Sequence, residues 1–222
     1  MIAIKRSRLA VVTVSLSATL ALSACGPAND DIAHSESSTA MYQAYNDSMT
    51  KMHSEMMLGM GYNDPDSAFT QGMLGHHLGA VDMANIQLKY GKDPEMLQLA
   101  QKIIDAQEVE IEQMQKWLNS HPDVAAPMAD TGAMQQAYAT GMNDMHGEMT
   151  LGITDPNPDM AFARGMLPHH RGAVDMAEVQ LEYGKDPEML QLAQEIIAAQ
   201  QSEIEQMQNW IKANGGVESN AQ

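Results

Sequence analysis

The sequence contains one segment twice, and this duplication constrains the fold more than any other feature. Residues 69–117 and 162–210 are identical at 37 of 49 aligned positions, with an offset of 93 residues. At the same offset Met41 matches Met134. Segments this similar are expected to adopt the same local structure, so the chain is interpreted as two tandem copies of one unit.

Each copy predicts three helices and no sheet. Apolar residues recur at alternate steps of three and four, which is typical of the buried face of a helix in a bundle. In copy one the helices are expected from about Thr39 to Leu58, from near Asp66 to Tyr90, and after Asp93, an N-cap residue followed by proline. Gly91 is expected to end the second helix in the left-handed conformation. The predicted fold class is all-α, with two tandem three-helix repeats.

Glycine and proline residues on the second helix are expected to affect its packing. Gly72, Gly75 and Gly79 line one face and are expected to let a neighbouring helix approach closely. In copy two Pro168 stands where copy one has Gly75. A proline inside a helix removes one backbone hydrogen bond, so a kink is expected immediately before His169.

The first 25 residues resemble a bacterial lipoprotein signal peptide. Lys5, Arg6 and Arg8 precede an apolar segment over residues 9–21 that is too short to span a membrane. Small residues then lead into Cys25, the only cysteine. We expect Cys25 to carry a lipid that anchors the protein to a membrane on the periplasmic side of the cell envelope. The alternative is an ordinary secretory signal with an incidental cysteine.

Changes in composition give the remaining boundaries. Residues 26–39 are predicted to be a flexible tether and residues 120–133 a linker. Repeat 1 is predicted over residues 40–119 and repeat 2 over residues 134–214, followed by a disordered tail at 215–222.

The charge and the single cysteine limit the possible partners. The chain has 12 basic and 29 acidic residues, which argues against a nucleic-acid partner and favours an acidic surface that attracts cations. If Cys25 is lipidated, no thiol remains for a disulfide or for a thiolate metal site. Histidine, methionine and carboxylate side chains would then have to hold any metal.

Methionine and histidine occupy positions where a bundle usually places leucine. Helical bundles often build metal sites from Glu-x-x-His, but this chain has Met73-x-x-His76 and Met166-x-x-His169 instead. Replacing a carboxylate by a thioether changes the preference from iron to Cu(I), and to Ag(I) by the same logic. The candidate metal ligands are Met49, Met52, His53, Met56, Met73, His76, His77 and Met83 in copy one, and Met142, Met145, His146, Met149, Met166, His169, His170 and Met176 in copy two.

A purely structural interpretation competes with the metal site. Methionine is flexible and fills gaps in cores, and a single buried histidine is more often hydrogen-bonded than a ligand. However, the chain has 21 methionines and only 2 phenylalanines. Adjacent histidines on a buried face are also costly unless their ring nitrogens are satisfied. We therefore predict a soft-metal site in each copy. Asp82 and Asp175 either orient a histidine or face water.

The pattern Phe-x-x-x-Met-x-x-His-His-x-x-Ala-x-x-Met, followed by Ala-x-x-Ile-x-x-x-Gln-x-x-Glu-Ile-x-x-Met-x-x-Trp, resembles a known family. In copy one it runs from Phe69 to Met83 and then from Ala100 to Trp117, and copy two repeats it. It is similar to family 305 of the bacterial secreted domains of unknown function, over nearly the whole chain after the signal. The resemblance implies a ferritin-like helical bundle in the cell envelope. Some members, of the CopM type, are periplasmic copper-binding proteins that use methionine and histidine.

Several functions follow from these features. The leading hypothesis is a non-enzymatic lipoprotein that sequesters or carries Cu(I) or Ag(I), contributes to metal tolerance or homeostasis, and has a possible copper-handling protein partner. One alternative is a copper-dependent or ferritin-like oxidase, for which only Glu110, Glu203, Asp82 and Asp175 offer carboxylates. Others are a b-type haem bundle with His and Met ligands, and a structural protein whose histidine pairs are inert.

Overall fold

The computed structural model describes residues 28–122 and 125–218, and all the regular elements in these ranges are helices. They are α1 (Ala28–Gly59), α2 (Pro65–Tyr90), α3 (Pro94–Ser120), α4 (Thr131–Gly152), α5 (Pro158–Tyr183) and α6 (Pro187–Ala213). The prediction of an all-α bundle made of two three-helix repeats is confirmed. The expected signal peptide and Cys25 lie outside the described residues.

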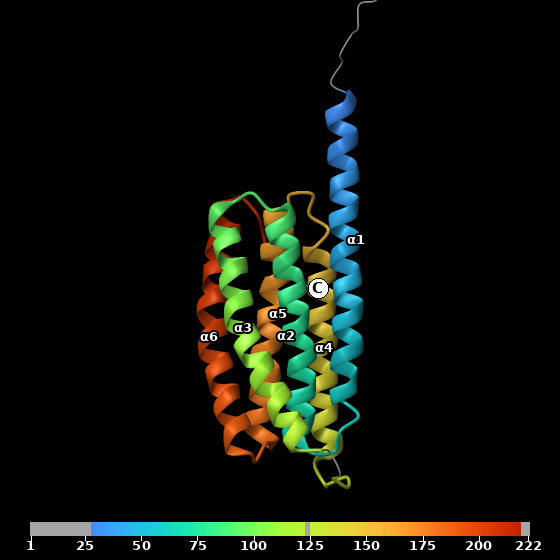
Figure 1. Ribbon diagram of the computed structural model, residues 1–222, viewed down its shortest axis with the longest axis vertical. Coiled ribbons are helices and arrows are strands. Elements are labelled where there is room, and N and C mark those ends of the chain that lie inside the picture. The colour runs from blue at the N-terminus through green and yellow to red at the C-terminus, as the bar shows by residue number, and fades with distance from the viewer. Residues whose placement is uncertain (1–27, 123–124, 219–222) are drawn as a thin grey trace, which may run out of the picture.

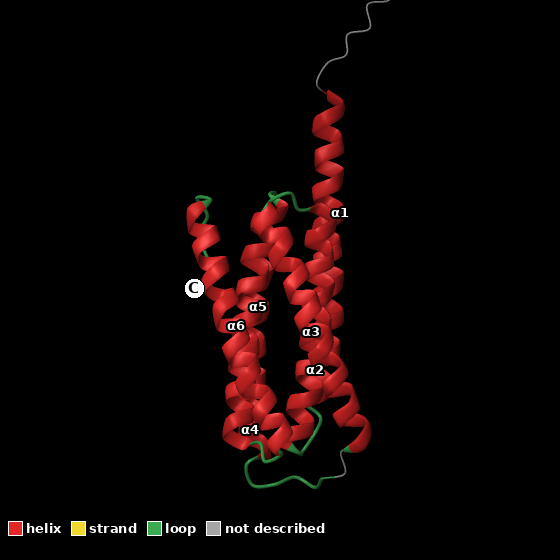
Figure 2. Ribbon diagram, turned by 60° about the vertical axis from the view of Figure 1, so that its left-hand side comes forward, coloured by secondary structure: helices red, strands yellow, loops and turns green. Residues whose placement is uncertain are grey.

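The two repeats form a single bundle around a central pair of helices (Figure 1). Helix α2 packs between α1 and α3, α5 packs between α4 and α6, and α2 contacts α5 directly. Figure 2 shows the same grouping from a second direction. Gly72 lies against Met176 and Gly165 lies against Met83, so α2 and α5 run antiparallel. The repeats therefore bury their histidine-bearing helices against each other.

Reciprocal hydrogen bonds join the repeats about a pseudo-two-fold axis. Asp66 of repeat 1 accepts hydrogen bonds from the Gln180 side chain (2.6 Å) and the Lys185 backbone N–H (3.0 and 3.1 Å) of repeat 2. Asp159, its equivalent, accepts from the Gln87 side chain (2.6 Å) and the Lys92 backbone N–H (2.9 and 3.2 Å) of repeat 1. Such exchange of equivalent contacts is the property of a two-fold interface. The duplication thus reproduces, within one chain, the geometry of a homodimer.

The predicted start of α3 at Asp93 is confirmed, whereas the predicted conformation of Gly91 is wrong. Asp93 caps α3 by accepting from the backbone N–H groups of Glu95 (2.9 Å) and Met96 (3.1 Å). Gly91, however, is extended, with φ −68° and ψ 161°, so the expected left-handed cap is wrong. A Cβ at this position would collide with the Gln87 side chain, which folds over the glycine on its way to Asp159. Glycine is needed there for space.

Both ends of the described chain are more ordered than the sequence predicted. Helix α1 begins at Ala28, and in Figure 1 its first turns extend beyond the rest of the bundle. Residues 28–39, expected as a tether, contain no proline or glycine to stop the helix from extending backwards. At the other end Glu218 pairs with Arg171 at 2.5 Å, which holds the tail against α5 as far as that residue. None of the described helices is long and apolar enough to cross a membrane.

Glycine allows close helix packing as predicted. A Cβ on Gly79 would stand 2.5 Å from the sulfur of Met52, and one on Gly172 would stand 2.5 Å from the sulfur of Met145. Helix α1 therefore lies close to α2, and α4 lies close to α5 in the same way. Helix α5 continues through Pro168 to Tyr183 as a single element.

Candidate metal centre

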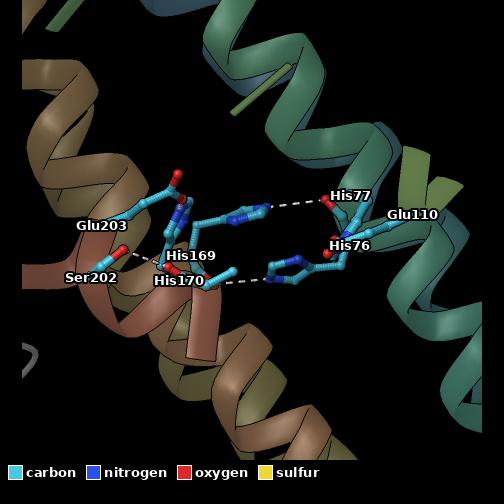
Figure 3. Close-up of polar contacts among 8 residues, drawn as sticks. His76, His77, Glu110, His169, His170, Ser202 and Glu203 are labelled. Atoms are coloured by element: carbon cyan, nitrogen blue, oxygen red, sulfur yellow. Dashed lines mark hydrogen bonds and ion pairs between the residues drawn. The ribbon is translucent and has the colours of Figure 1, made fainter. Parts of the chain in front are cut away.

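Two of the predicted ligands, His76 and His169, stack on each other at the centre of the bundle. Both are 0% exposed, and their ring centroids are 3.6 Å apart. Each ring donates a hydrogen bond from Nε2 to the backbone carbonyl of the other histidine, at 3.0 and 3.1 Å (Figure 3). The pair joins the two repeats directly. The histidines of the sequence motif are thus part of the interface between α2 and α5.

The other histidine of each pair points to a different neighbour. His77 donates from Nε2 to the Glu110 carboxylate of α3 at 2.5 Å, and His170 donates to Glu203 of α6 at 2.7 Å. Both rings are completely buried, whereas the carboxylates are about one-fifth exposed. The Nε2 atoms of adjacent histidines therefore bond to different partners, and the two ring centroids are 6.1 Å apart in each repeat.

Burial determines the protonation of the central pair. It holds the pKa of His76 and His169 well below the ordinary value of 6.5, and the neighbouring imidazoles lower it further. The hydrogen bonds to backbone carbonyls oppose this effect. With the proton on Nε2, each neutral ring has a lone pair on Nδ1. In the described structure, Nδ1 of all four buried histidines has no hydrogen-bond partner. A buried lone pair without a donor is a potential ligand for a soft cation.

The histidines of the outer helices form a third pair. His53 on α1 and His146 on α4 are both exposed, and their ring centroids are 5.7 Å apart. The duplicated sequence predicted separate sites for them, one in each copy. The fold instead brings them together across the boundary between the repeats.

The predicted methionine ligands all lie in the core. Met73 and Met166 are 0% exposed, and the other eight are at most 7% exposed. Met83 of repeat 1 lies against Gly165 of repeat 2, and Met176 lies against Gly72 of repeat 1. The thioethers of the two copies are therefore interleaved at the interface.

Four of the eight residues that line a small cavity at the interface are methionines. Met56 and Met60 approach it from repeat 1, and Met142 and Met176 approach it from repeat 2. Its volume is about 10 Å³, close to that of a single water-sized occupant. The remaining lining includes Tyr138, whose buried hydroxyl has no hydrogen-bond partner in the described part of the chain. The fold therefore brings four methionine side chains, two from each repeat, to one small space.

Met60 and Tyr138 were not among the predicted site residues. Met60 follows the last turn of α1, beyond the periodic positions that identified the other methionines. Tyr138 carries a phenol, which is not a soft donor and so gives no signal for Cu(I) or Ag(I). The equivalent of Met60 in copy two is Ile153. The two copies therefore differ at this place, and comparing them could have identified Met60.

The carboxylates do not form a hard-metal cluster. Asp82 pairs with Lys51 at 3.0 Å, while Asp175 is exposed, and the pKa of its carboxyl is raised by partial desolvation and by Glu178, Asp144 and Glu148. Over residues 28–122 and 125–218, no three imidazole, thiolate or carboxylate groups converge as metal ligands. A metal site of three or more protein ligands in this region would need donors other than these three kinds, and the buried thioethers are one such kind. That chemistry favours Cu(I) and Ag(I) over iron.

The fold and sequence match proteins of known structure. CopM in its Cu(I)-bound form is 34% identical, with a TM-score of 0.51, covering 68% of this chain and 98% of CopM. CopM in an Ag-bound form gives 32% identity and a TM-score of 0.51, covering 67% and 95% of the two chains. A putative secreted protein from Streptomyces coelicolor has a TM-score of 0.56 at 25% identity, covering 72% and 99%.

The sequence also matches a relative and a family model. The uncharacterized protein L153 of Acanthamoeba polyphaga mimivirus is 43% identical over 49 residues, which are 22% of this chain and only 32% of that protein. The family model described as domain of unknown function DUF305 matches residues 66–211, which contain the paired histidines of both repeats. The chain therefore belongs to the DUF305 family.

Proposed function

We propose that this protein binds Cu(I) and Ag(I) through methionine and histidine, and that it sequesters or carries these ions outside the cytoplasm. The observation that carries the proposal is the cavity lined by Met56, Met60, Met142 and Met176. Thioethers are soft, uncharged ligands that suit Cu(I) and Ag(I) and have little affinity for Mg(II) or Ca(II). The metal is the cargo of such a protein.

Two further observations support this function. The buried histidines keep an unpartnered Nδ1 lone pair in the described structure, which gives the core imidazole donors besides its thioethers. CopM, to which the chain is similar, has been crystallised in Cu(I)-bound and Ag-bound forms. The acidic surface, with 29 acidic against 12 basic residues, would attract cations to the protein.

Anchoring to a membrane is part of the same proposal. The basic, apolar and small-residue order of residues 1–25 supports export and lipidation at Cys25. A relative from Streptomyces coelicolor is described as a putative secreted protein, which agrees with export. The protein would then act in the periplasmic part of the cell envelope, where it contributes to metal tolerance and can pass its ion to a copper-handling partner.

Replacing two cavity thioethers should remove the tightest-bound ion. In the double variant Met56→Leu/Met142→Leu, one donor is lost from each repeat while the core keeps a similar volume. Mutating a residue that only hydrogen-bonds to a metal ligand changes the metal affinity about 10–100-fold. Losing two ligands should therefore weaken the binding of the first metal ion by at least that factor. Competition against a chromogenic Cu(I) chelator measures this affinity.

The duplication provides a matched control. Met149 is the equivalent of Met56, and Met49 is the equivalent of Met142. Ile153 stands at the position equivalent to Met60, so this second place has one thioether fewer. The variant Met49→Leu/Met149→Leu should therefore still bind the first Cu(I) ion with the affinity of the wild type. Equal affinities in the two double variants would exclude the cavity as the principal site. A wild-type protein that fails to compete for Cu(I) and binds Ca(II) instead would contradict the proposed function itself.

A further inference from the structure

The exposed pair His53 and His146 lies on the pseudo-two-fold axis of the molecule. The residues are equivalent, since they are 93 positions apart, and their ring centroids are separated by only 5.7 Å. Two groups related by a two-fold axis can meet only beside that axis. The core pair His76 and His169 is equivalent in the same sense, with centroids 3.6 Å apart. The axis therefore passes through both pairs, one at the surface and one in the core.

Each surface histidine follows a methionine that packs against the helix of a core histidine. Met52 and Met145 precede His53 and His146 in sequence, and both are buried. The sulfur of Met52 lies against Gly79, one helical turn after His76, and the sulfur of Met145 lies against Gly172, one turn after His169. Each repeat therefore offers an exposed imidazole, a buried thioether and a buried imidazole. All six are donors for a soft cation.

The surface pair has the dimensions of a two-histidine site. Two imidazoles that each bind one ion through a nitrogen at roughly 2 Å have ring centroids roughly 6 Å apart. The observed 5.7 Å fits this geometry, and neither ring makes a hydrogen bond within the described residues. Each repeat contributes one ring, so neither copy could form this site alone.

We propose that His53 and His146 form one shared capture site, which takes a Cu(I) or Ag(I) ion from solvent and delivers it to the thioethers beneath. The identity of the ion rests on the proposed function, whereas the sharing of one site between the repeats rests on geometry alone. A single ion on the axis replaces the two separate surface sites that the duplicated sequence predicts.

Silver titration of the full mature chain tests this arrangement, because Ag(I) is diamagnetic and redox-stable. The protein carries ¹⁵N-labelled histidine and ¹³C-methyl-labelled methionine. The ring nitrogens of His53 and His146 should shift together and saturate at the same single equivalent. His53→Ala should abolish the shift of His146 at that equivalent, and His146→Ala should abolish that of His53. Each single variant should lose one equivalent of surface-bound Ag(I), and the double variant should lose no more.

His121 provides the matched control. It is also exposed, but its ring stacks on Trp117 at 4.2 Å, and the equivalent position in copy two is Asn214 rather than a histidine. His121→Ala should leave the coupled shifts unchanged. Separate saturation of His53 and His146 at two equivalents would overturn the shared site. If the methionine methyl resonances shift while those of His53 and His146 do not, the shared capture site is excluded but the proposed function is not. If no resonance shifts at all, both proposals fail.

Discussion

Replacing Asp159 by alanine should lower the free energy of unfolding by about 3–5 kcal/mol. The buried carboxylate accepts hydrogen bonds from the Gln87 side chain and from the backbone N–H groups of Lys92 and Asp93. Bonds to a charged acceptor contribute about 1.5–3 kcal/mol each, and the buried Gln87 amide would be left without its partner. Urea unfolding, followed by circular dichroism, measures the loss.

The duplication makes this prediction testable twice. Asp66→Ala should cause a loss of similar size, because Asp66 makes the equivalent bonds to Gln180 and Lys185. Asp47, which is exposed on α1, serves as the control, and Asp47→Ala should change the stability by less than about 0.5 kcal/mol. If either the Asp66 or the Asp159 variant is as stable as the control, the carboxylates do not hold the repeats together.

The metal-free protein should lose stability steeply as the pH falls below 6.5. His76 and His169 have a pKa well below 6.5 in the folded state because they are buried. Below pH 6.5 the unfolded chain binds two protons that the folded chain cannot, so folding becomes less favourable as the pH decreases. The loss approaches about 2.7 kcal/mol per pH unit for the pair and continues until the folded pKa is reached.

The double variant His76→Gln/His169→Gln should flatten this dependence between pH 6.5 and 5. Glutamine can still donate a hydrogen bond to the opposite carbonyl but does not titrate. Urea midpoints at several pH values, with a chelator present, give the two slopes. His121→Gln is the control and should keep the wild-type slope. Asp175, whose raised pKa acts in the opposite direction, is present in every variant and cancels. Identical slopes for the double variant and the wild type would contradict the prediction.

The fold could be predicted from the sequence because its signals are local. The periodicity of Leu, Ile and Met positions needs only one helix to be recognised, and Asp93 followed by Pro94 fixes a helix start within one turn. Gly91 shows the limit of this reasoning. Its backbone is extended because the Gln87 side chain passes over it to reach Asp159, a residue of the other repeat. A contact of that kind leaves no trace in the local sequence.

The candidate site, too, could be predicted from the sequence only in part. The amino-acid types at each position, with Met73 and His76 one turn apart, are enough to predict soft-donor chemistry, because ligand softness belongs to the side chain and not to its packing. The partners of these residues depend on how α2 packs against α5. His76 meets His169, while His77, the next residue, turns to Glu110 because successive helical residues point about 100° apart.

The sequence by itself determined that the chain is two copies of a three-helix unit rich in methionine and histidine. Only the tertiary structure decided that the copies share one core. Placing equivalent helices face to face creates a two-fold axis, and residues beside that axis meet their own equivalents, as His53 meets His146. The sequence predicted a site in each copy because a repeat encodes the same side chains twice. Which of them come together depends on the packing between the copies, since that packing sets the position of the axis.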